Sequence, residues 1–210
     1  MTDVRVGSGI ACDGYRESRE PSSLSAVTVE SSQPAGETFR VGVDVEIDAN
    51  PGTVFDYVAD LPRSGEWSPE CRGGDWVSGQ PAAVGSVFRA RNHRRPDVVA
   101  WAPVVRGEWT TECEIVESTR PSAFRWAMRD RAGRRQQSVW SFELRPGAAG
   151  GTVLTHAFWM GELTEGMRGI LAELDDAGRR RFVAEWAEKL RDDMETSANR
   201  IRAAVERGGR

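Results

Sequence analysis

The feature of this sequence that most constrains its fold is a change of hydrophobic period near the C-terminus. Upstream, apolar residues recur at every second position in several stretches, whereas from residue 182 onward they recur about every 3.6 positions, the repeat of an α-helix. The apolar stripe of this helix consists of Phe182, Trp186, Leu190, Met194, Ile201 and Val205. A helix with such a stripe has to bury it, and the only large apolar surface elsewhere is one face of a predicted sheet.

Alternation with a period of two predicts the strands of that sheet. Val41, Val43, Val45 and Ile47 alternate with glycine or acidic residues, as expected of a strand with one solvated face. Further strands are predicted at 84–93, 109–118, 123–130, 136–145 and 152–160, with a shorter one near 75–78. Turn residues at 132–133 and 146–151 join consecutive strands, which indicates an antiparallel meander.

Two short helices are predicted after the first strand. Asn50 and Pro51 are typical of a helix start, and Pro62 is expected to end this helix before a second one near 63–67. The predicted fold class is therefore α+β. We expect a seven-stranded curved antiparallel sheet that wraps around the long C-terminal helix.

The chain divides into an arm and one domain. Residues 1–38 are rich in Ser, Glu, Gly and Pro, so they cannot bury enough apolar surface to offset the cost of ordering. We expect a disordered N-terminal arm, with a lid or a partner-binding tail as the alternative, followed by one ligand-binding domain at 39–210.

Composition excludes several classes of function. A net charge of −4 argues against nucleic-acid binding, which needs clustered positive charge. No apolar run approaches the length of a membrane span, and the N-terminus lacks the apolar region of a signal peptide, so no membrane insertion is expected. Cys12, Cys71 and Cys113 are far apart and form no CxxC pair, which favours a reducing compartment, the cytoplasm.

The inward-facing alternates of the strands supply the candidate site. Most are aromatic or apolar, and a few are polar, the mixture typical of a pocket that orients an organic ligand. The candidate ligand-binding residues are Trp67, Phe88, Asn92, Trp109, Thr111, Cys113, Trp126, Met128, Gln136, Ser138, Trp140, Phe158 and Trp186. The tryptophans could instead be core residues, and each polar residue could lie at a solvated strand end. The outward alternates are largely Arg and Glu, which predicts cross-strand ion pairs.

His156 is the candidate catalytic residue. It lies in the inward register beside aromatic residues, where a near-neutral pKa would permit proton transfer to a bound substrate. The alternative is a core histidine with one satisfied hydrogen bond. Cys113 is expected to be a small core residue rather than a nucleophile, because apolar surroundings disfavour its thiolate.

Several segments together resemble the polyketide cyclase/dehydrase-like branch of the SRPBCC (START-like) superfamily. The resemblance covers about Arg40 to Glu206. It rests on the segments 44–51, 54–60 and 113–124 and on the last helix. It also rests on four short motifs: EWSPE at 66–70, VGSVFR at 84–89, WSFEL at 140–144 and GTVLT at 151–155. It implies a helix-grip fold with a ligand cavity between sheet and helix. It does not imply one activity, because the superfamily holds many functions on one scaffold.

Three functions remain open. The first is a cyclase, aromatase or dehydratase of polyketide-like natural products, the second is a noncatalytic carrier or sensor of an apolar ligand, and the third is a protein-interaction module. The sequence contains no Gly-rich phosphate loop, HExxH or GxSxG motif and only two histidines, so no cofactor and no metal site is expected. The expected partner is a small hydrophobic molecule.

Two connections are longer than ordinary turns. The segments 94–107 and 161–178 both carry apolar residues, and the second is expected to contain a helix with Met167, Ile170, Leu171 and Leu174. Such segments are often lids or interfaces, so each is a candidate gate or homodimer contact, with local packing as the alternative.

Overall fold

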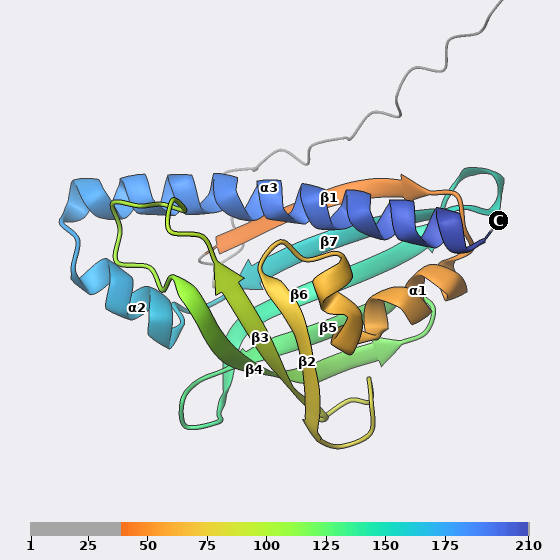
Figure 1. Cartoon of the computed structure of the whole chain (residues 1–210), viewed down its shortest axis with the longest axis horizontal. Helices are drawn as coiled ribbons and strands as arrows, with labels where there is room; N and C mark the ends of the chain where they lie inside the picture. Colours follow the sequence, from red (N-terminus) through yellow and green to blue (C-terminus); the bar gives the residue numbers. More distant parts are fainter. Residues whose placement is uncertain (1–38, 210) are drawn as a thin grey trace, which may run out of the picture.

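The computed structural model describes residues 39–209, so the predicted disordered arm at 1–38 lies outside the described residues. Seven strands form one antiparallel sheet in the order β1-β7-β6-β5-β4-β3-β2 (Figure 1). The strands are β1 (Phe39–Ile47), β2 (Cys71–Ser78), β3 (Val87–Arg94), β4 (Gly107–Thr119), β5 (Ala123–Arg129), β6 (Arg135–Pro146) and β7 (Thr152–Met160). The α+β prediction with a seven-stranded meander is confirmed.

Helices cover one side of this sheet. The helices are α1 (Pro51–Ala59), η1 (Leu61–Glu66), η2 (Ala148–Gly150), α2 (Glu165–Ala172) and α3 (Asp176–Gly208). Figure 1 shows α3 running the length of the molecule alongside β1, with α2 near its start and α1 near its end. None of the helices within the described part of the chain is long and apolar enough to cross a membrane.

The predicted register places the apolar alternates inside. In β1, Val41, Val43, Val45 and Ile47 are all buried, and they join the main core with Leu190, Met194, Ile201 and Val205 of α3. The burial of these residues follows from the pleat, because successive side chains of a strand point to opposite faces. The α3 stripe from Leu190 to Val205 therefore packs on the inner face of the sheet, as predicted, whereas Phe182 packs with Ala102 and Val104.

The outer face of the sheet carries the expected ion pairs. Arg89 lies 2.8 Å from Glu112 of the neighbouring strand, and Arg125 lies 2.8 Å from Glu143. Glu112 also pairs with Arg129, at 3.2 Å. These are solvent-facing contacts that stabilise little individually, so their value here is to confirm which face of each strand points outward.

Three predicted boundaries are wrong. β3 begins at Val87, because Gly85 adopts a φ of 84° and breaks the strand, which leaves Val84 exposed in the preceding turn. β2 begins at Cys71 instead of 75, since the glycines at its start hid the alternation. Pro62 does not end α1, which stops at Ala59, and instead occupies the first turn of η1.

The long connection between β3 and β4 is held by one arginine. The guanidinium of Arg106 donates hydrogen bonds to the backbone carbonyls of Val98, Val99, Ala102 and Val104. Four backbone carbonyls of this segment are thereby satisfied from within the segment.

The same connection forms a second, smaller hydrophobic cluster. Ala102 and Val104 pack with Phe182 near the start of α3, and Met167, Ile170, Leu171 and Leu174 from the α2 region pack around them. The expected helix in 161–178 is present as α2, which contains Met167, Ile170 and Leu171 but ends at Ala172, before Leu174. Both long connections pack locally over the end of the domain. Their roles as gate or dimer contact remain predictions.

Replacing Phe124 by Ala should destabilise the fold strongly. Phe124 is fully buried and packs edge-on against Phe55 of α1 at a centroid distance of 6.1 Å, so its loss leaves a cavity where α1 meets β5. We expect a loss of about 3–5 kcal/mol in the free energy of unfolding, measured by urea denaturation. Val84→Ala is the control, because this exposed valine should matter by less than about 0.5 kcal/mol. Similar effects of the two substitutions would contradict the assigned core.

Candidate functional site

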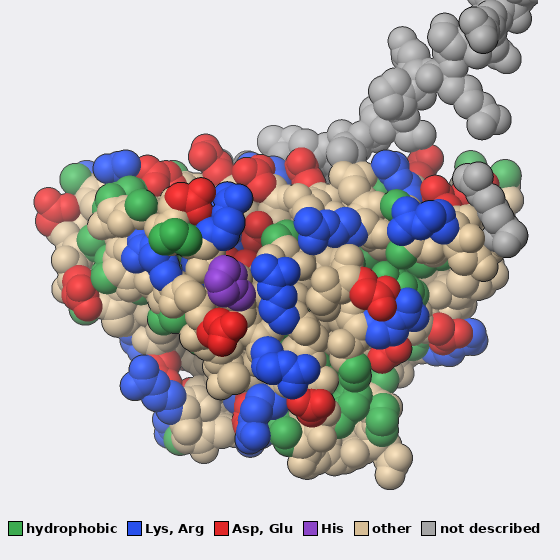
Figure 2. Space-filling model, in the orientation of Figure 1, with side chains coloured by type: hydrophobic (Ala, Val, Ile, Leu, Met, Phe, Trp, Pro, Cys, Tyr) green, Lys and Arg blue, Asp and Glu red, His purple; other side chains and the backbone are tan. Residues whose placement is uncertain are grey.

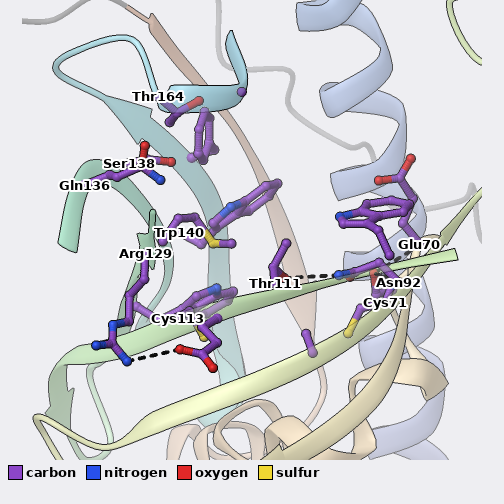
Figure 3. Close-up of a pocket in the computed structure, with 18 of the residues that line it drawn as sticks. Glu70, Cys71, Asn92, Thr111, Cys113, Arg129, Gln136, Ser138, Trp140 and Thr164 are labelled. Atoms are coloured by element: carbon purple, nitrogen blue, oxygen red, sulfur yellow. Dashed lines mark hydrogen bonds and ion pairs between the residues drawn. The ribbon is translucent and has the colours of Figure 1, made fainter. Parts of the chain in front are cut away.

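A cavity of about 1240 Å³ lies between the inner face of the sheet and α3 (Figure 3). Every residue that the sequence predicted to bind ligand lines it, and so does His156. These residues are Trp67, Phe88, Asn92, Trp109, Thr111, Cys113, Trp126, Met128, Gln136, Ser138, Trp140, Phe158 and Trp186. The sheet places them together because alternate residues of neighbouring strands share one face.

Aromatic rings form much of the cavity wall. Trp126 of β5 and Trp140 of β6 are cross-strand neighbours with nearly parallel rings, 8° apart and with centroids separated by 6.5 Å. Phe158 of β7 continues the row, with its centroid 4.7 Å from that of Trp140. The wall therefore offers broad, rigid ring surfaces against which a planar apolar molecule can pack.

The predicted polar residues are mostly engaged with other protein groups. The side-chain amide of Asn92 donates to the hydroxyl of Thr111 at 3.1 Å, and the amide oxygen of Gln136 accepts from the backbone N–H of Glu165 at 2.8 Å. Gln136 thus ties the start of α2 to β6. Ser138 also lines the cavity and is buried.

His156 is buried below the aromatic wall. Its ring lies 4.5 Å from that of Phe142, 5.7 Å from that of Trp140 and 6.2 Å from that of Trp67, measured between centroids. Neither ring nitrogen has a hydrogen-bond partner among the described residues. The expected single hydrogen bond of a core histidine is therefore not present.

The predicted near-neutral pKa of His156 is wrong. Complete burial lowers the pKa to about 3, because the surrounding rings cannot solvate an imidazolium. The imidazole is therefore neutral at physiological pH and is a weak base. A proton shuttle at this position would also require the neighbouring rings to move, since both nitrogens are covered.

Cys113 is an unreactive wall residue. Burial raises the pKa of its thiol to about 12, so almost no thiolate exists at neutral pH. This agrees with the prediction of a small core residue. The other cavity thiol, Cys71, lies 3.0 Å from the hydroxyl of Ser64.

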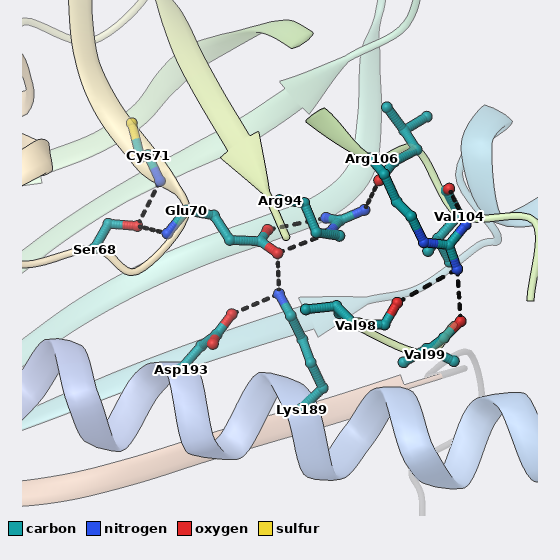
Figure 4. Close-up of polar contacts among 11 residues, drawn as sticks. Ser68, Glu70, Cys71, Arg94, Val98, Val99, Val104, Arg106, Lys189 and Asp193 are labelled. Atoms are coloured by element: carbon teal, nitrogen blue, oxygen red, sulfur yellow. Dashed lines mark hydrogen bonds and ion pairs between the residues drawn. The ribbon is translucent and has the colours of Figure 1, made fainter. Parts of the chain in front are cut away.

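The sequence analysis missed a cluster of four charged residues on the same wall, shown in Figure 4. Glu70, just before β2, pairs with Arg94 at the end of β3 at 2.7 Å and with Lys189 of α3 at 2.7 Å. Lys189 also pairs with Asp193, one turn further along α3, at 2.5 Å. We call these four residues the ionic cluster.

The ionic cluster adjoins two tryptophans of the cavity. The guanidinium of Arg94 lies 4.6 Å from the ring centre of Trp109 and 4.9 Å from that of Trp186. Such cation–π contacts favour keeping the charge between the rings. One signal for this cluster was present in the sequence: Lys189 is the only lysine of the chain, and it lies between the stripe residues Trp186 and Leu190.

The two carboxylates of the cluster differ in acidity. Burial alone would raise the pKa of Glu70, yet its hydrogen bonds from Arg94 and the charge of Lys189 outweigh burial and hold the pKa below its usual value. For Asp193 burial is the stronger effect, and its pKa is raised although Lys189 opposes the change. Asp193 is therefore the carboxylate of the cluster that takes up a proton more readily.

Replacing His156 by Phe should make the protein more resistant to acid. The folded pKa of about 3 lies below the ordinary value of 6.5, so the unfolded chain binds a proton that the folded chain rejects. The resulting loss of stability is absent well above pH 6.5 and grows as the pH falls toward about 3, by up to about 1.4 kcal/mol per pH unit. Urea denaturation of both proteins at pH 7.5 and pH 5 measures this difference, and equal pH dependence in both would contradict the assigned burial.

Three solved structures share the fold at low sequence identity. The Zhui aromatase/cyclase from Streptomyces sp. R1128 has 14% identity and a TM-score of 0.58, with 82% of this chain and 96% of that chain covered. A Staphylococcus aureus protein of unknown function, SA2116, has 9% identity and a TM-score of 0.53, with 81% and 96% covered. The di-domain ARO/CYC BexL of the BE-7585A biosynthetic pathway has 17% identity and a TM-score of 0.51; 80% of this chain matches 48% of it.

At identities this low, the likeness to the solved structures shows a shared fold alone. Comparison with curated protein sequences gives no match. The sequence profile of one family, described as polyketide cyclase / dehydrase and lipid transport, matches residues 38–206. That range contains every strand from β1 to β7, the cavity wall and nearly all of α3. The chain therefore belongs to the polyketide cyclase / dehydrase and lipid transport family.

Proposed function

We propose that this protein binds a small hydrophobic or aromatic organic molecule in its cavity and converts it as a cofactor-independent cyclase, aromatase or dehydratase of polyketide-like compounds. The observation that carries the proposal is the large cavity with its wall of Trp126, Trp140 and Phe158. Ligand pockets of about 300–1000 Å³ hold drug-sized molecules, so a cavity of about 1240 Å³ has room for a multi-ring compound.

The aromatic wall would contribute by positioning the ligand. Rigid rings on adjacent strands restrict a flexible chain to a few folded shapes, and holding reacting carbon atoms close together accelerates their bond formation. Membership of the family and the aromatase/cyclase name of one structural neighbour, Zhui, support this choice of chemistry.

A noncatalytic carrier or sensor is the second candidate, favoured by one specific observation. Neither His156 nor Cys113, the two titratable side chains among the predicted site residues, can exchange protons readily at neutral pH. Native mass spectrometry of the freshly purified protein separates the two functions. A bound compound that is released unchanged after incubation supports a carrier, and its conversion to a cyclised or dehydrated product supports an enzyme.

Replacing Trp140 by Ala should weaken ligand binding. With 1-naphthol as a probe, we expect the dissociation constant to rise about tenfold, because the substitution removes ring contacts worth about 1.4 kcal/mol. Quenching of tryptophan fluorescence measures the affinity. The matched control is Trp101→Ala, since Trp101 packs with Phe182 in the second cluster and does not line the cavity. Equal losses in the two variants, or wild-type affinity in Trp140→Ala, would contradict the proposed site.

A further inference from the structure

The ionic cluster has the composition of a binding site for a polar group at one end of an apolar cavity. Its four side chains are largely withdrawn from solvent, with exposures of 10% for Arg94, 12% for Lys189, 19% for Glu70 and 26% for Asp193. Burying charges costs free energy that a pair only partly recovers, and apolar residues would hold α3 against the sheet at least as well. The hydrogen-bonding groups that the ionic cluster leaves unused therefore point to a role beyond packing.

Two members of the cluster, Arg94 and Glu70, use most of their hydrogen-bonding groups on each other and on their protein neighbours. The guanidinium of Arg94 donates through Nε and Nη2 to the two oxygens of Glu70, and through Nη1 to the backbone carbonyl of Val105. Glu70 accepts at both oxygens, and its Oε1 also contacts Lys189. These two residues form a fixed frame (Figure 4).

Lys189 and Asp193 are different. The ammonium of Lys189 has three N–H donors, of which two are used, by Glu70 Oε1 at 2.7 Å and by Asp193 Oδ2 at 2.5 Å. Within residues 39–209, nothing is bonded to its third donor or to Oδ1 of Asp193. Lys189 and Asp193, which both line the cavity, thus retain one free donor and one free acceptor, and the ammonium of Lys189 lies 5.1 Å from the ring centre of Trp186.

We propose that Lys189 and Asp193 bind the carboxyl group of an aromatic acid, with one proton shared between that carboxyl and Asp193. The proposal rests on the proposed function in that it uses the same cavity. One ligand oxygen accepts from the free N–H of Lys189, and the other meets Oδ1 of Asp193 through the shared proton. The ring system of the acid extends from this point into the aromatic part of the cavity.

Charge balance explains why a proton has to accompany the ligand. The groups that face Asp193 are Lys189 on its own helix, Glu70 before β2 and Arg94 on β3, so the ionised cluster holds two cations and two carboxylates. A ligand carboxylate would add an uncompensated third negative charge. Burial already raises the pKa of Asp193, so this residue takes up the proton that restores neutrality.

The sign of the pH dependence follows. Above the pKa of Asp193, binding of the anionic acid consumes one proton from solvent, so its affinity falls by up to about tenfold for each unit of rising pH. An uncharged ligand of the same shape adds no charge and needs no proton. Its affinity should not change over the same range.

The experiment compares 1-naphthoate with its methyl ester by fluorescence titration and isothermal calorimetry at pH 6, 7 and 8. For the wild-type protein we expect the affinity for naphthoate to fall with pH while that for the ester stays constant. Asp193→Asn, which preserves shape and can donate to the carboxylate, should make naphthoate binding independent of pH. Lys189→Met should weaken naphthoate binding at least tenfold and leave ester binding within twofold. Asp192→Asn is the matched control, because Asp192 lies next in sequence but does not line the cavity.

The outcomes separate this proposal from the proposed function. Two results would overturn the carboxyl site and leave the aromatic cavity in place. The first is binding of the ester without binding of naphthoate, and the second is binding of both with an affinity for naphthoate that does not change with pH. Failure of both probes to bind would count against the proposed function itself, and with it the carboxyl site. Thermal unfolding of each variant shows whether it is folded. Calorimetry in two buffers tests the wild-type protein without any substitution, and we expect an uptake of about one proton per bound naphthoate.

Discussion

The architecture depends on how one helix is held at its two ends. Toward its C-terminus, Ile201 and Val205 of α3 are buried in the main core, where α1 and the sheet close over them. Near its N-terminus, Phe182 is buried in the second cluster beneath the β3–β4 connection. The cavity lies along the stretch between these anchors, where α3 contributes Trp186 through Ser197 to its wall. A helix fixed at both ends can leave space under its middle without the sheet and helix collapsing together.

Sequence periodicity predicted the arrangement of the sheet and α3 well, because the spacing of apolar residues is a local signal. A period of two determines which side chains of a strand share a face, and the candidate ligand-binding residues that it placed on the strands, from Phe88 to Phe158, do line the cavity. Glycines weakened the signal at β2 and at the start of β3, where both boundaries were wrong. The backbone departs from regular pleating there, and the pattern of hydrophobic residues does not reveal such a departure.

Properties that depend on depth and on distant partners could not be predicted in the same way. The orientation of His156 follows from alternation, but its low pKa arises because Trp140 and Phe142 of β6 and Trp67, just after η1, together enclose it. The ionic cluster joins residue 70, residue 94 and two positions of α3, and nothing in the period of any one segment brings them together. The polar side of a helix looks uniform in sequence, whether a given residue faces solvent or a cavity. Together, these features divide the cavity into an aromatic part, where the pKa of His156 is lowered and that of Cys113 is raised, and an ionic end, where burial raises the pKa of Asp193.

The arginine-held connection between β3 and β4 bears on how this scaffold can diversify. Because Arg106 satisfies carbonyls of its own segment, and Ala102 and Val104 pack with Phe182 in the second cluster, the shape of residues 98–104 does not depend on the cavity-wall side chains of β4, β5 and β6. Wall residues on β4, β5 and β6 can therefore be exchanged to suit a different ligand while this connection keeps its form. A library of variants restricted to those strand positions would thus explore new ligand preferences with little risk of disrupting this end of the domain.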